Sequence, residues 1–407
     1  MRQTRSRPLR WDVFCRVVDN YGDAAVCWRL ARELAARSRP DGGADCGGCV
    51  RLRIDGLEVL GTLCPEVDAH AARQSVAGVE ILRWHDDTPF GPDESGEPAD
   101  VAVDAFGCGL PDAYAEAMAA RDPASLWITL EYLSAEPWVA SHHGLPSPHP
   151  RLALRRYFFF PGFGTDTGGL IKEEGLEARR DAFLADPEAR GAFWQARGFA
   201  PPAPEALAVS LFGYENSGVG SLLDAWANSD RPVVAAVPPG KLLPQVLAYF
   251  DAPPASDAAA VGKAMRQGNL EVRLLPFLAQ PRYDELLWTC DWNFVRGEDS
   301  FVRAQWAARP FVWHIYPQAD DAHWAKLDAF LDHWCAGLHG EPARSLRRFW
   351  LAWNGRGDCG MAWRSMVIHQ KALAEHARRW PKALDLAGNL AEKLAQFCED
   401  RLKSPAS

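Results

Sequence analysis

Short runs of apolar, β-branched or aromatic residues recur through the first half of the chain, at residues 12–18, 50–54, 79–84, 101–106, 126–130 and 157–160. Such runs predict buried β-strands. Helix-like segments separate several of them, most clearly at residues 23–37, where Val26, Leu30 and Leu34 share one face and Asp23 suits the N-cap position. The alternation of strands and helices predicts a mainly parallel sheet that is covered on both faces.

The alternation starts again after residues 174–204, a charged and then proline-rich stretch that we interpret as a helix followed by a linker. Further strands are predicted at residues 206–214, 232–237, 272–275, 292–295 and 310–315. The pattern predicts an α/β chain of two Rossmann-like domains that face a cleft, at residues 1–190 and 205–365, followed by C-terminal helices at residues 366–407. Ligands of such sheets bind beyond the carboxyl ends of the strands, so we expect functional residues in the loops after strands.

Composition excludes several classes of protein. The 407 residues are enough for two domains, each with its own core. A net charge of −9 disfavours non-specific binding to nucleic acid or to anionic membranes. No apolar run approaches the ~18–20 residues of a membrane span, and the basic N-terminus lacks the apolar stretch of a secretory signal. We therefore expect a soluble, cytoplasmic protein that binds neither nucleic acid nor membranes.

Ten cysteines do not form a recognisable framework of disulfides or metal ligands. Cys15, Cys27 and Cys290 lie in apolar segments and are expected to be small buried hydrophobes. Cys46 and Cys49 have a suggestive spacing, but no second pair of cysteines or histidines follows at the spacing of a zinc site. We expect no metal site in this chain.

The loop after the first predicted strand is a candidate for chemistry, because Asp19 and Asp23 flank Asn20, Tyr21 and Gly22 there. One carboxylate could act as a base, while the backbone N–H groups at the helix start face an anion. A tight turn with Asp23 as its N-cap explains the same loop without catalysis, although it leaves Asp19 unexplained. On the local pattern alone, both interpretations stay open.

A second candidate is the string RGEDSFVR at residues 296–303, which follows one predicted strand and precedes a helix. Two-domain glycosyltransferases bind the diphosphate of a nucleotide-sugar at this position. Ser300 could bind phosphate there through its hydroxyl and N–H groups, while Glu298 and Asp299 bind sugar hydroxyls. The alternative is a capping box with two acids at the helix start. Aromatic residues that could stack on a planar base, or simply belong to the core, lie near this loop: Phe212, Tyr214, Phe277 and Tyr283.

Taken together, these segments resemble the elongation factor P arginine rhamnosyltransferases, the EarP family. The resemblance is carried in the first half by VDNYGD (18–23), WRLAR (28–32), EYLSAE (131–136), PGF (161–163) and TGGL (167–170). In the second half it is carried by LFGY (211–214), PF (276–277) with Gln280 and Tyr283, RGEDSFVR (296–303) and WHIYPQ (313–318). These strings run in order through most of the chain, and the last two are long enough to be highly specific.

The resemblance implies a GT-B glycosyltransferase that moves rhamnose from dTDP-β-L-rhamnose to an arginine of elongation factor P, with inversion at the anomeric carbon. The modified factor would then help ribosomes through polyproline stretches. The first domain would bind the arginine-bearing domain of the factor and the second the donor, without a metal or other cofactor. Matched to the family motifs, Asp23 is the expected base, Asp19 orients the arginine, and Glu298 is the third catalytic residue. Donor-binding positions are expected at Asn20, Tyr21, Gly22, Phe212, Tyr214, Phe277, Gln280, Tyr283, Arg296, Glu298, Asp299 and Ser300.

Two other interpretations remain at this point. The chain could be another nucleotide-sugar transferase or epimerase of GT-B fold that acts on a small molecule. It could also be a non-catalytic protein that binds a translation factor, although the intact acids at positions 19, 23 and 298 argue against that.

Overall fold

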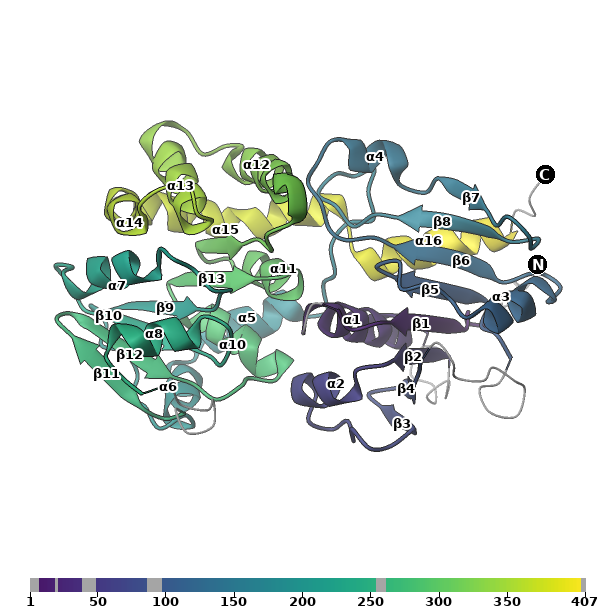
Figure 1. Cartoon of the computed structure of the whole chain (residues 1–407), viewed down its shortest axis with the longest axis horizontal. Coiled ribbons are helices and arrows are strands. Elements are labelled where there is room, and N and C mark those ends of the chain that lie inside the picture. Colours follow the sequence, from purple (N-terminus) through teal and green to yellow (C-terminus); the bar gives the residue numbers. More distant parts are fainter. Residues whose placement is uncertain (1–6, 19–20, 39–48, 86–96, 254–260, 404–407) are drawn as a thin grey trace. The chain divides into compact units, whose positions relative to one another are not determined.

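The computed structural model describes residues 7–18, 21–38, 49–85, 97–253 and 261–403 of the chain (Figure 1). The chain forms two units, one made of Met1–Glu174 with Leu384–Ser407 and the other of Gly175–Ala383. Each unit is built around its own sheet of mainly parallel strands, as the alternating pattern predicts.

The sheet of the first unit has the strand order β3-β4-β2-β1-β5-β6-β8-β7. Its parallel strands are β1 (Trp11–Cys15), β2 (Val50–Ile54), β4 (Val79–Arg83), β5 (Val101–Ala105), β6 (Leu126–Leu130) and β8 (Arg155–Phe159). The helices of this unit are α1 (Gly22–Arg37), α2 (Leu57–Leu63), α3 (Asp112–Ala119), α4 (Trp138–His142) and α16 (Leu390–Lys403). Because β1 pairs with both β2 and β5, the strand order reverses at its carboxyl end, where doubly wound sheets bind ligands.

The sheet of the second unit has the order β11-β12-β10-β9-β13-β14. Its parallel strands are β9 (Leu207–Leu211), β10 (Val233–Val237), β12 (Leu270–Leu274), β13 (Trp292–Arg296) and β14 (Phe311–His314). β9 pairs with β10 and β13, so this sheet reverses its order beyond β9 and β13. The helices and one 3-10 turn are α5 (Leu176–Ala185), α6 (Pro187–Gln195), α7 (Val219–Ala227), α8 (Leu243–Tyr249), α10 (Gln280–Thr289), α11 (Asp299–Trp306), η1 (Ala319–Asp321), α12 (Ala322–Cys335), α13 (Gly340–Trp353), α14 (Cys359–Val367) and α15 (Gln370–Ala387), whose end joins the first unit.

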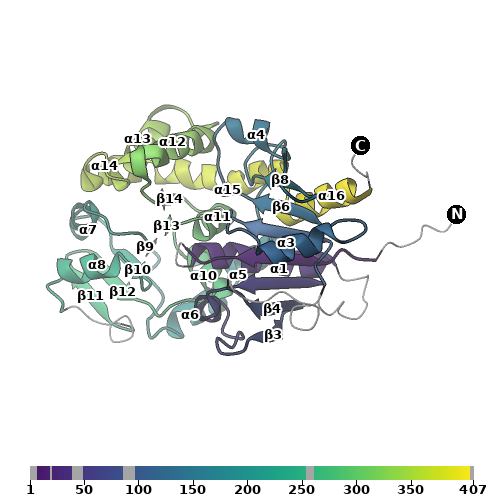
Figure 2. The ribbon, with the colours of Figure 1, turned by 45° about the vertical axis from the view of Figure 1, so that its right-hand side comes forward.

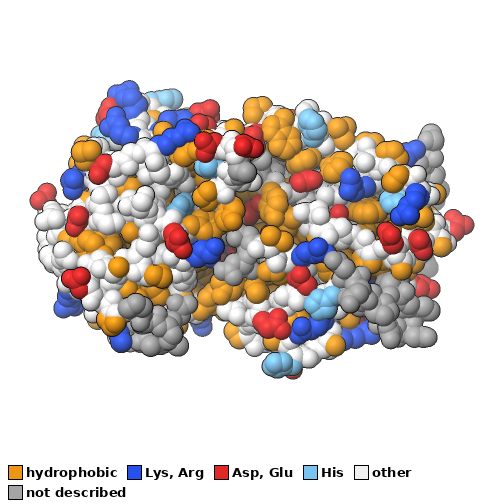
Figure 3. Space-filling view, in the orientation of Figure 1, with side chains coloured by type: hydrophobic (Ala, Val, Ile, Leu, Met, Phe, Trp, Pro, Cys, Tyr) orange, Lys and Arg blue, Asp and Glu red, His pale blue; other side chains and the backbone are white. Residues whose placement is uncertain are grey.

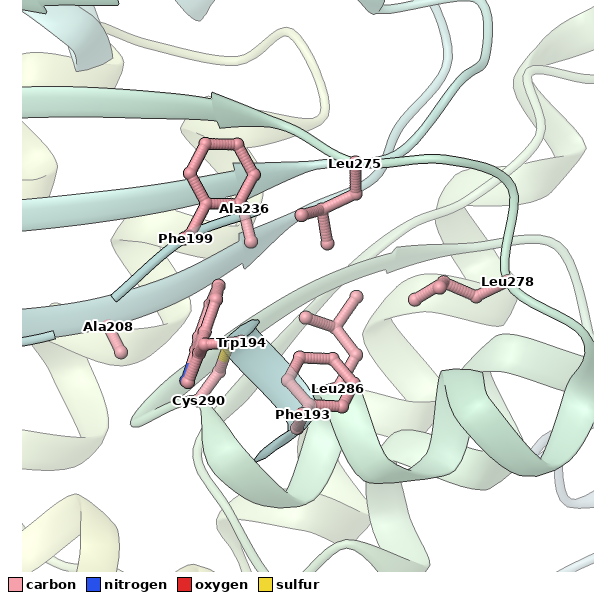
Figure 4. Close-up of a cluster of buried hydrophobic side chains, with 9 residues drawn as sticks. All are labelled: Phe193, Trp194, Phe199, Ala208, Ala236, Leu275, Leu278, Leu286 and Cys290. Carbon is pink, nitrogen blue, oxygen red and sulfur yellow. The ribbon is translucent and has the colours of Figure 1, made fainter. Parts of the chain in front are cut away.

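Residues 176–199 belong to the core of the second unit. Phe193, Trp194 and Phe199 are buried in one cluster with side chains from β9, β10, α10 and the loop after β12: Ala208, Ala236, Leu275, Leu278, Leu286 and Cys290 (Figure 4). Burying a large apolar side chain stabilises a fold by about 1.5–3 kcal/mol, so these aromatic residues fold with the second sheet. The predicted boundaries at residues 1–190, 205–365 and 366–407 therefore differ from the two units seen in the structure.

The C-terminal segment from Leu384 folds with the first sheet instead of forming a separate tail. Figures 1 and 2 show α16 running along β6 and β8, and the ring of Phe397 packs against the rings of Tyr157 and Phe159. The glycine-rich segment at residues 161–170 holds this arrangement, because the ammonium of Lys393 donates to the carbonyls of Thr165 and Thr167, 2.8 and 2.6 Å away. This segment is thus an anchor for the C-terminal helices.

Gly169 is required at the closest approach of that anchor to the C-terminal segment. Its φ is +71°, and a Cβ there would lie 2.1 Å from the carbonyl oxygen of Gly388. Any other residue would therefore clash as well as be strained.

Three short edge strands were not predicted: β3 (Arg73–Val76), β7 (Pro146–Pro148) and β11 (Ala264–Gln267), each antiparallel to its neighbour. They are polar, proline-containing or largely exposed, so they lack the apolar run by which central strands are recognised. The predicted burial of Cys15, Cys27 and Cys290 is confirmed. Among the described residues, no helix combines the length and the apolarity that crossing a membrane requires.

Candidate active site

The loop after β1 is tied to the neighbouring strand. The N–H of Val17 donates to the carboxylate of Asp55, which follows β2, over 2.9 Å. Gly56 allows this approach, since a Cβ there would lie 2.6 Å from a methyl group of Val17. The next residue, Val18, is 76% exposed. The chain is therefore fixed up to the point at which the predicted catalytic loop begins.

Asp23 is buried, with 2% of its surface exposed, and it is the second residue of α1. The predicted N-cap role of Asp23 is wrong, because Tyr21 occupies the N-cap position and Asp23 is the second residue of the helix. Instead, one oxygen of the Asp23 carboxylate accepts the N–H of Val18 over 2.9 Å, and the other accepts the hydroxyl of Tyr132 over 3.3 Å. The carboxylate of Asp23 is therefore buried and held in one orientation by two hydrogen bonds.

The other predicted residues of this loop are only partly described. Asp19 and Asn20 lie outside the described residues, so the pairing of Asp19 with Asp23 stays a prediction. Tyr21 and Gly22 are half-buried at the start of α1, next to Asp23. Their predicted contact with the donor is likewise untested.

In the second unit, Arg296 ends β13 and is 6% exposed. Its guanidinium carbon lies 4.6 Å from the ring centre of Phe212 and 4.7 Å from that of Tyr214, both of which follow β9. Within the described residues, this guanidinium forms no ion pair, and its buried Nε has no hydrogen-bond partner. A buried cation that lacks an anion is costly, and it therefore suits the binding of an anionic ligand.

The positive charge of Arg296 acts on a neighbouring histidine. Burial and Arg296 lower the pKa of His314 from its ordinary value to about 4. The Nδ1 atom of His314 accepts the N–H of Tyr214 over 3.3 Å. At neutral pH this ring is uncharged, and its tautomer carries the proton on Nε2. The string WHIYPQ gave the position of His314, but only the three-dimensional contact reveals its partner.

The acidic loop after Arg296 does not form the capping box that was the alternative explanation. Glu298 is the N-cap residue of α11, but its side chain makes no capping bond. The hydroxyl of Ser300 donates to the carbonyl of Arg296 and accepts the Arg296 N–H over 3.2 Å. The Ser300 hydroxyl therefore shapes the loop, and the N–H groups at the start of α11 are the donors this loop offers to an anion. Asp299 is buried in the same turn.

A buried ion pair fixes the helix that carries the remaining predicted residues. Arg303 of α11 donates to both oxygens of Asp284 on α10, over 2.8 and 2.6 Å. Since α10 also carries Gln280 and Tyr283, this pair sets their position relative to α11. The ring of Tyr283 meets Phe212 edge to face, 6.1 Å between centres, and burial raises its pKa. Phe277, half-buried, lies in the loop that precedes α10.

The structure therefore brings Phe212, Tyr214, Tyr283 and Arg296 into direct or neighbouring contact. Sequence reasoning missed the roles of Tyr132, His314 and the Arg303–Asp284 pair. Tyr132 and His314 lie at or just after the ends of strands, and Asp284 and Arg303 lie in helices α10 and α11, but in each case the partner is distant in sequence. Among the described residues, no group of three or more potential ligands could hold a metal ion. Cys46 lies outside those residues, so its pairing with Cys49 stays open.

Comparison with known proteins gives consistent results over nearly the whole chain. Residues 11–399 match the family model described as elongation factor P (EF-P) rhamnosyltransferase EarP. A protein-arginine rhamnosyltransferase of Pseudomonas putida is 47% identical, over 96% of this chain and 99% of that protein. One of Pseudomonas aeruginosa is 44% identical over the same shares of the two chains.

A solved structure gives the same result for the fold. It is described as the structural basis for EarP-mediated arginine glycosylation of translation elongation factor EF-P. It is 34% identical, covers 97% of this chain and 99% of its own, and has a TM-score of 0.66. The predicted α/β architecture of a GT-B glycosyltransferase, with C-terminal helices after the second sheet, is confirmed.

Proposed function

The chain belongs to the EarP family of EF-P rhamnosyltransferases, and from this premise we propose that it transfers rhamnose from dTDP-β-L-rhamnose to one arginine of elongation factor P in the cytoplasm. The anomeric carbon is inverted, and no metal or other cofactor takes part. The modified factor then supports translation of polyproline stretches. The first unit binds the arginine-bearing domain of the factor, and the second binds the donor.

The observation that carries this proposal is the buried guanidinium of Arg296. It is stacked on two aromatic rings and forms no ion pair within the described residues. It follows that an anion from outside the chain is its natural partner, and a diphosphate offers two negative groups. The N–H groups at the start of α11 lie at the end of the same loop and favour the same ligand. A leaving diphosphate held in this way needs no metal to neutralise its charge.

The remaining donor residues divide between the base and the sugar. We assign the thymine and rhamnose to the surroundings of Phe212, Tyr214, Phe277, Gln280 and Tyr283, because planar rings stack on aromatic side chains and the amide of Gln280 can bond polar edges. Glu298 and Asp299 accept hydrogen bonds from sugar hydroxyls. Ser300 contributes its backbone N–H, since its hydroxyl is engaged with Arg296. Asn20, Tyr21 and Gly22 complete the set, as the family motif suggests.

The acceptor presents a chemical difficulty that a carboxylate can solve. A guanidinium keeps its proton above pH ~12, and its lone pairs are delocalised, so it is a poor nucleophile. Charge-assisted hydrogen bonds to Asp19 and Asp23 localise its charge on part of the group. One guanidinium nitrogen then attacks C1 of rhamnose, the bond from C1 to the diphosphate oxygen breaks, and dTDP leaves with the electron pair. Asp23 takes the proton that this nitrogen loses.

Intact-mass measurement of elongation factor P after incubation with the enzyme and dTDP-rhamnose tests the proposal. One deoxyhexose should be added to the factor, and none when its arginine is replaced by lysine. Parallel reactions with UDP-sugars, and with small molecules in place of the factor, test the alternatives. Transfer to a small molecule alone would favour another GT-B transferase, and binding of the factor without any release of dTDP would favour a non-catalytic protein.

A further inference from the structure

Three neighbouring strands of the first unit end close to Asp23. The sheet places β1, β5 and β6 side by side and parallel, so their carboxyl ends share one edge. Asp23 follows β1, Phe106 follows β5, and Tyr132 follows β6. Tyr132 belongs to the string EYLSAE, to which the predicted mechanism gives no role.

Tyr132 is held at both ends. Its hydroxyl donates to the Asp23 carboxylate over 3.3 Å, and its ring stacks on that of Phe106 with centres 4.4 Å apart and an angle of 16°. Phe106 itself adopts a left-handed backbone, with a φ of +58°, which is strained for an aromatic residue. Its N–H donates to the carbonyl of Leu130 over 2.7 Å and fixes this turn to the end of β6. Backbone strain of this kind is commonly kept at functional sites.

Tyr132 is far more exposed than the carboxylate it contacts. Asp23 is 2% exposed, whereas Tyr132 is 41% exposed. Hydrophobic and histidine side chains gather around α4 on the face of this unit seen in Figure 3, and Trp138 of α4 is 43% exposed. The phenol that contacts the buried carboxylate is thus itself open to solvent.

We propose that Tyr132 is a positioning residue of the transfer reaction, whose hydroxyl holds the Asp23 carboxylate in the plane in which it receives the acceptor guanidinium. The inference rests on the function proposed above. The Val18 N–H fixes one carboxylate oxygen and Tyr132 the other, so the plane of the group is set by two directional bonds. A planar guanidinium bonds a carboxylate best in a shared plane, and small losses of alignment slow the reaction. The 3.3 Å separation is long for a hydroxyl donor, and such bonds commonly shorten when substrate binds.

The pH profile gives a readout that a purely structural role would not move. A hydroxyl that donates to an ionised carboxylate lowers the pKa of that acid, so its removal should raise the pKa of Asp23. Among the described residues, the titratable groups near Asp23 include the buried thiols of Cys15 and Cys27 and the carboxyl of Asp55 beyond the loop. A hydrogen bond with Cys27 and burial raise the pKa of Cys15 well above its ordinary value, so this thiol does not titrate in the working range.

The test compares Tyr132→Phe with Tyr249→Phe. Tyr249 of α8 is a matched control in the second unit, since its hydroxyl donates to the carboxylate of Asp224 over 2.8 Å and no role in the reaction is assigned to either residue. Rates of rhamnose transfer to elongation factor P are measured from pH 3.5 to 9, so that the range includes the titration of an aspartate, together with dTDP affinity and Tm. For Tyr132→Phe we expect kcat to fall about two- to tenfold and the acid limb of the kcat profile to move to higher pH. Its dTDP affinity should not change, and Tyr249→Phe should keep the wild-type profile.

The outcomes separate this inference from the proposed function. If the wild-type enzyme adds no rhamnose to the factor, the proposed function fails. If it does and the acid limb of Tyr132→Phe stays in place, the inference about Tyr132 alone is overturned, whatever the change in rate. A shift that also appears in Tyr249→Phe would overturn it equally, because the effect would then not be specific to Asp23.

Discussion

The two units place opposite charges beyond the carboxyl ends of strands that border the reversal of strand order, β1 in the first unit and β13 in the second. In the first unit, the loop after β1 leads to a buried carboxylate, Asp23, whose oxygens accept hydrogen bonds from an N–H group and a phenol. In the second, β13 ends in a buried guanidinium, Arg296, which lies against two aromatic rings. Both residues are nearly inaccessible to solvent. The contrast teaches that the fold supplies the position, while the residues at the loop decide which ligand charge is accepted.

The charges are also supported in different ways. Hydrogen-bond donors already hold the oxygens of Asp23, so its orientation exists before any ligand binds. Arg296 lies against two aromatic faces and forms no ion pair within the described residues, and such faces attract a cation without neutralising it. A carboxylate prepared in this way suits catalysis, whereas a cation left without an anion suits tight binding of one. Variants on the two sides should therefore fail differently.

The largest effect is expected for Asp23→Asn. The amide keeps the size of the side chain but cannot take a proton, so the rate of transfer should fall ~100–10,000-fold. Affinity for dTDP, measured by calorimetry, should stay near that of the wild type. Asp112→Asn is the control, because Asp112 is likewise in the first turn of a helix of the first unit but is exposed. If Asp23→Asn lost dTDP affinity by as large a factor as it lost rate, Asp23 would be assigned to the donor site. The contrast between the units would then be wrong.

Arg296→Met should give the second-largest effect, and this effect should fall on dTDP affinity, which Asp23→Asn leaves unchanged. Loss of charged hydrogen bonds to the diphosphate should weaken dTDP binding by about 1.5–3 kcal/mol. Thermal stability should not fall, because the variant removes a buried charge that has no ion-pair partner in the described structure.

Arg303→Met is the matched comparison for Arg296→Met. Its removal leaves Asp284 buried without its partner, so Tm should fall clearly. A fall in Tm for Arg296→Met as large as that for Arg303→Met would show that Arg296 is a structural residue.

The central strands of both units could be predicted from sequence, because local runs of apolar residues indicate buried strands. β2 and β6 begin and end where the pattern predicts. The first strand was predicted too long, since the chain turns after Cys15 toward the catalytic loop. The strand predicted to end at Phe106 was also predicted too long, because Phe106 adopts a left-handed backbone. An aromatic residue gives no sign of this conformation in the sequence.

Local motifs predicted which loops form the candidate site, but not which side chains contact one another there. An acid in the first turn of a helix has the pattern of a cap, and nothing nearby in the sequence shows that Asp23 bonds Tyr132, which lies 109 positions away. Similarly, the hydroxyl of Ser300 was expected to face phosphate, but it closes its own loop onto Arg296. Contacts between such distant residues depend on the order of the strands in the sheet. No single segment of the sequence determines that order, so these contacts could not be predicted.

A smaller effect is expected on the donor side for Tyr283→Leu. The substitution keeps most of the apolar volume against Phe212 but removes the ring face, so the donor KM should rise about fivefold to tenfold, at the low end of base-stacking losses. The rate at saturating donor should stay close to that of the wild type. Steady-state kinetics with varied dTDP-rhamnose measures both quantities. An unchanged donor KM would assign Tyr283 to the core alone.

The last expected effect is on stability and concerns one neutral histidine in each unit. Burial lowers the pKa of His143 in the first unit and of His314 in the second to about 4. Each Nδ1 atom accepts a backbone N–H, from Phe160 and Tyr214 respectively. Because the unfolded chain takes up these protons near pH 6.5 and the folded one only near 4, stability is complete above pH 6.5 and is lost as the pH falls through this window. The loss from His314 at pH 5 should be on the order of 1–2 kcal/mol.

Replacing either histidine by asparagine keeps an acceptor near Nδ1 and should reduce the fall in Tm between pH 7 and pH 5. If the Tm of His314→Asn fell between pH 7 and pH 5 by as much as that of the wild type, the low pKa of this ring would be contradicted. Saturating dTDP sharpens the comparison between the units, because His314 feels the charge of Arg296 and His143 does not. A diphosphate next to Arg296 offsets that charge and raises the pKa of His314 toward its ordinary value. With dTDP bound, the fall in Tm between pH 7 and pH 5 should differ less between the wild type and His314→Asn. The corresponding difference between the wild type and His143→Asn should not change.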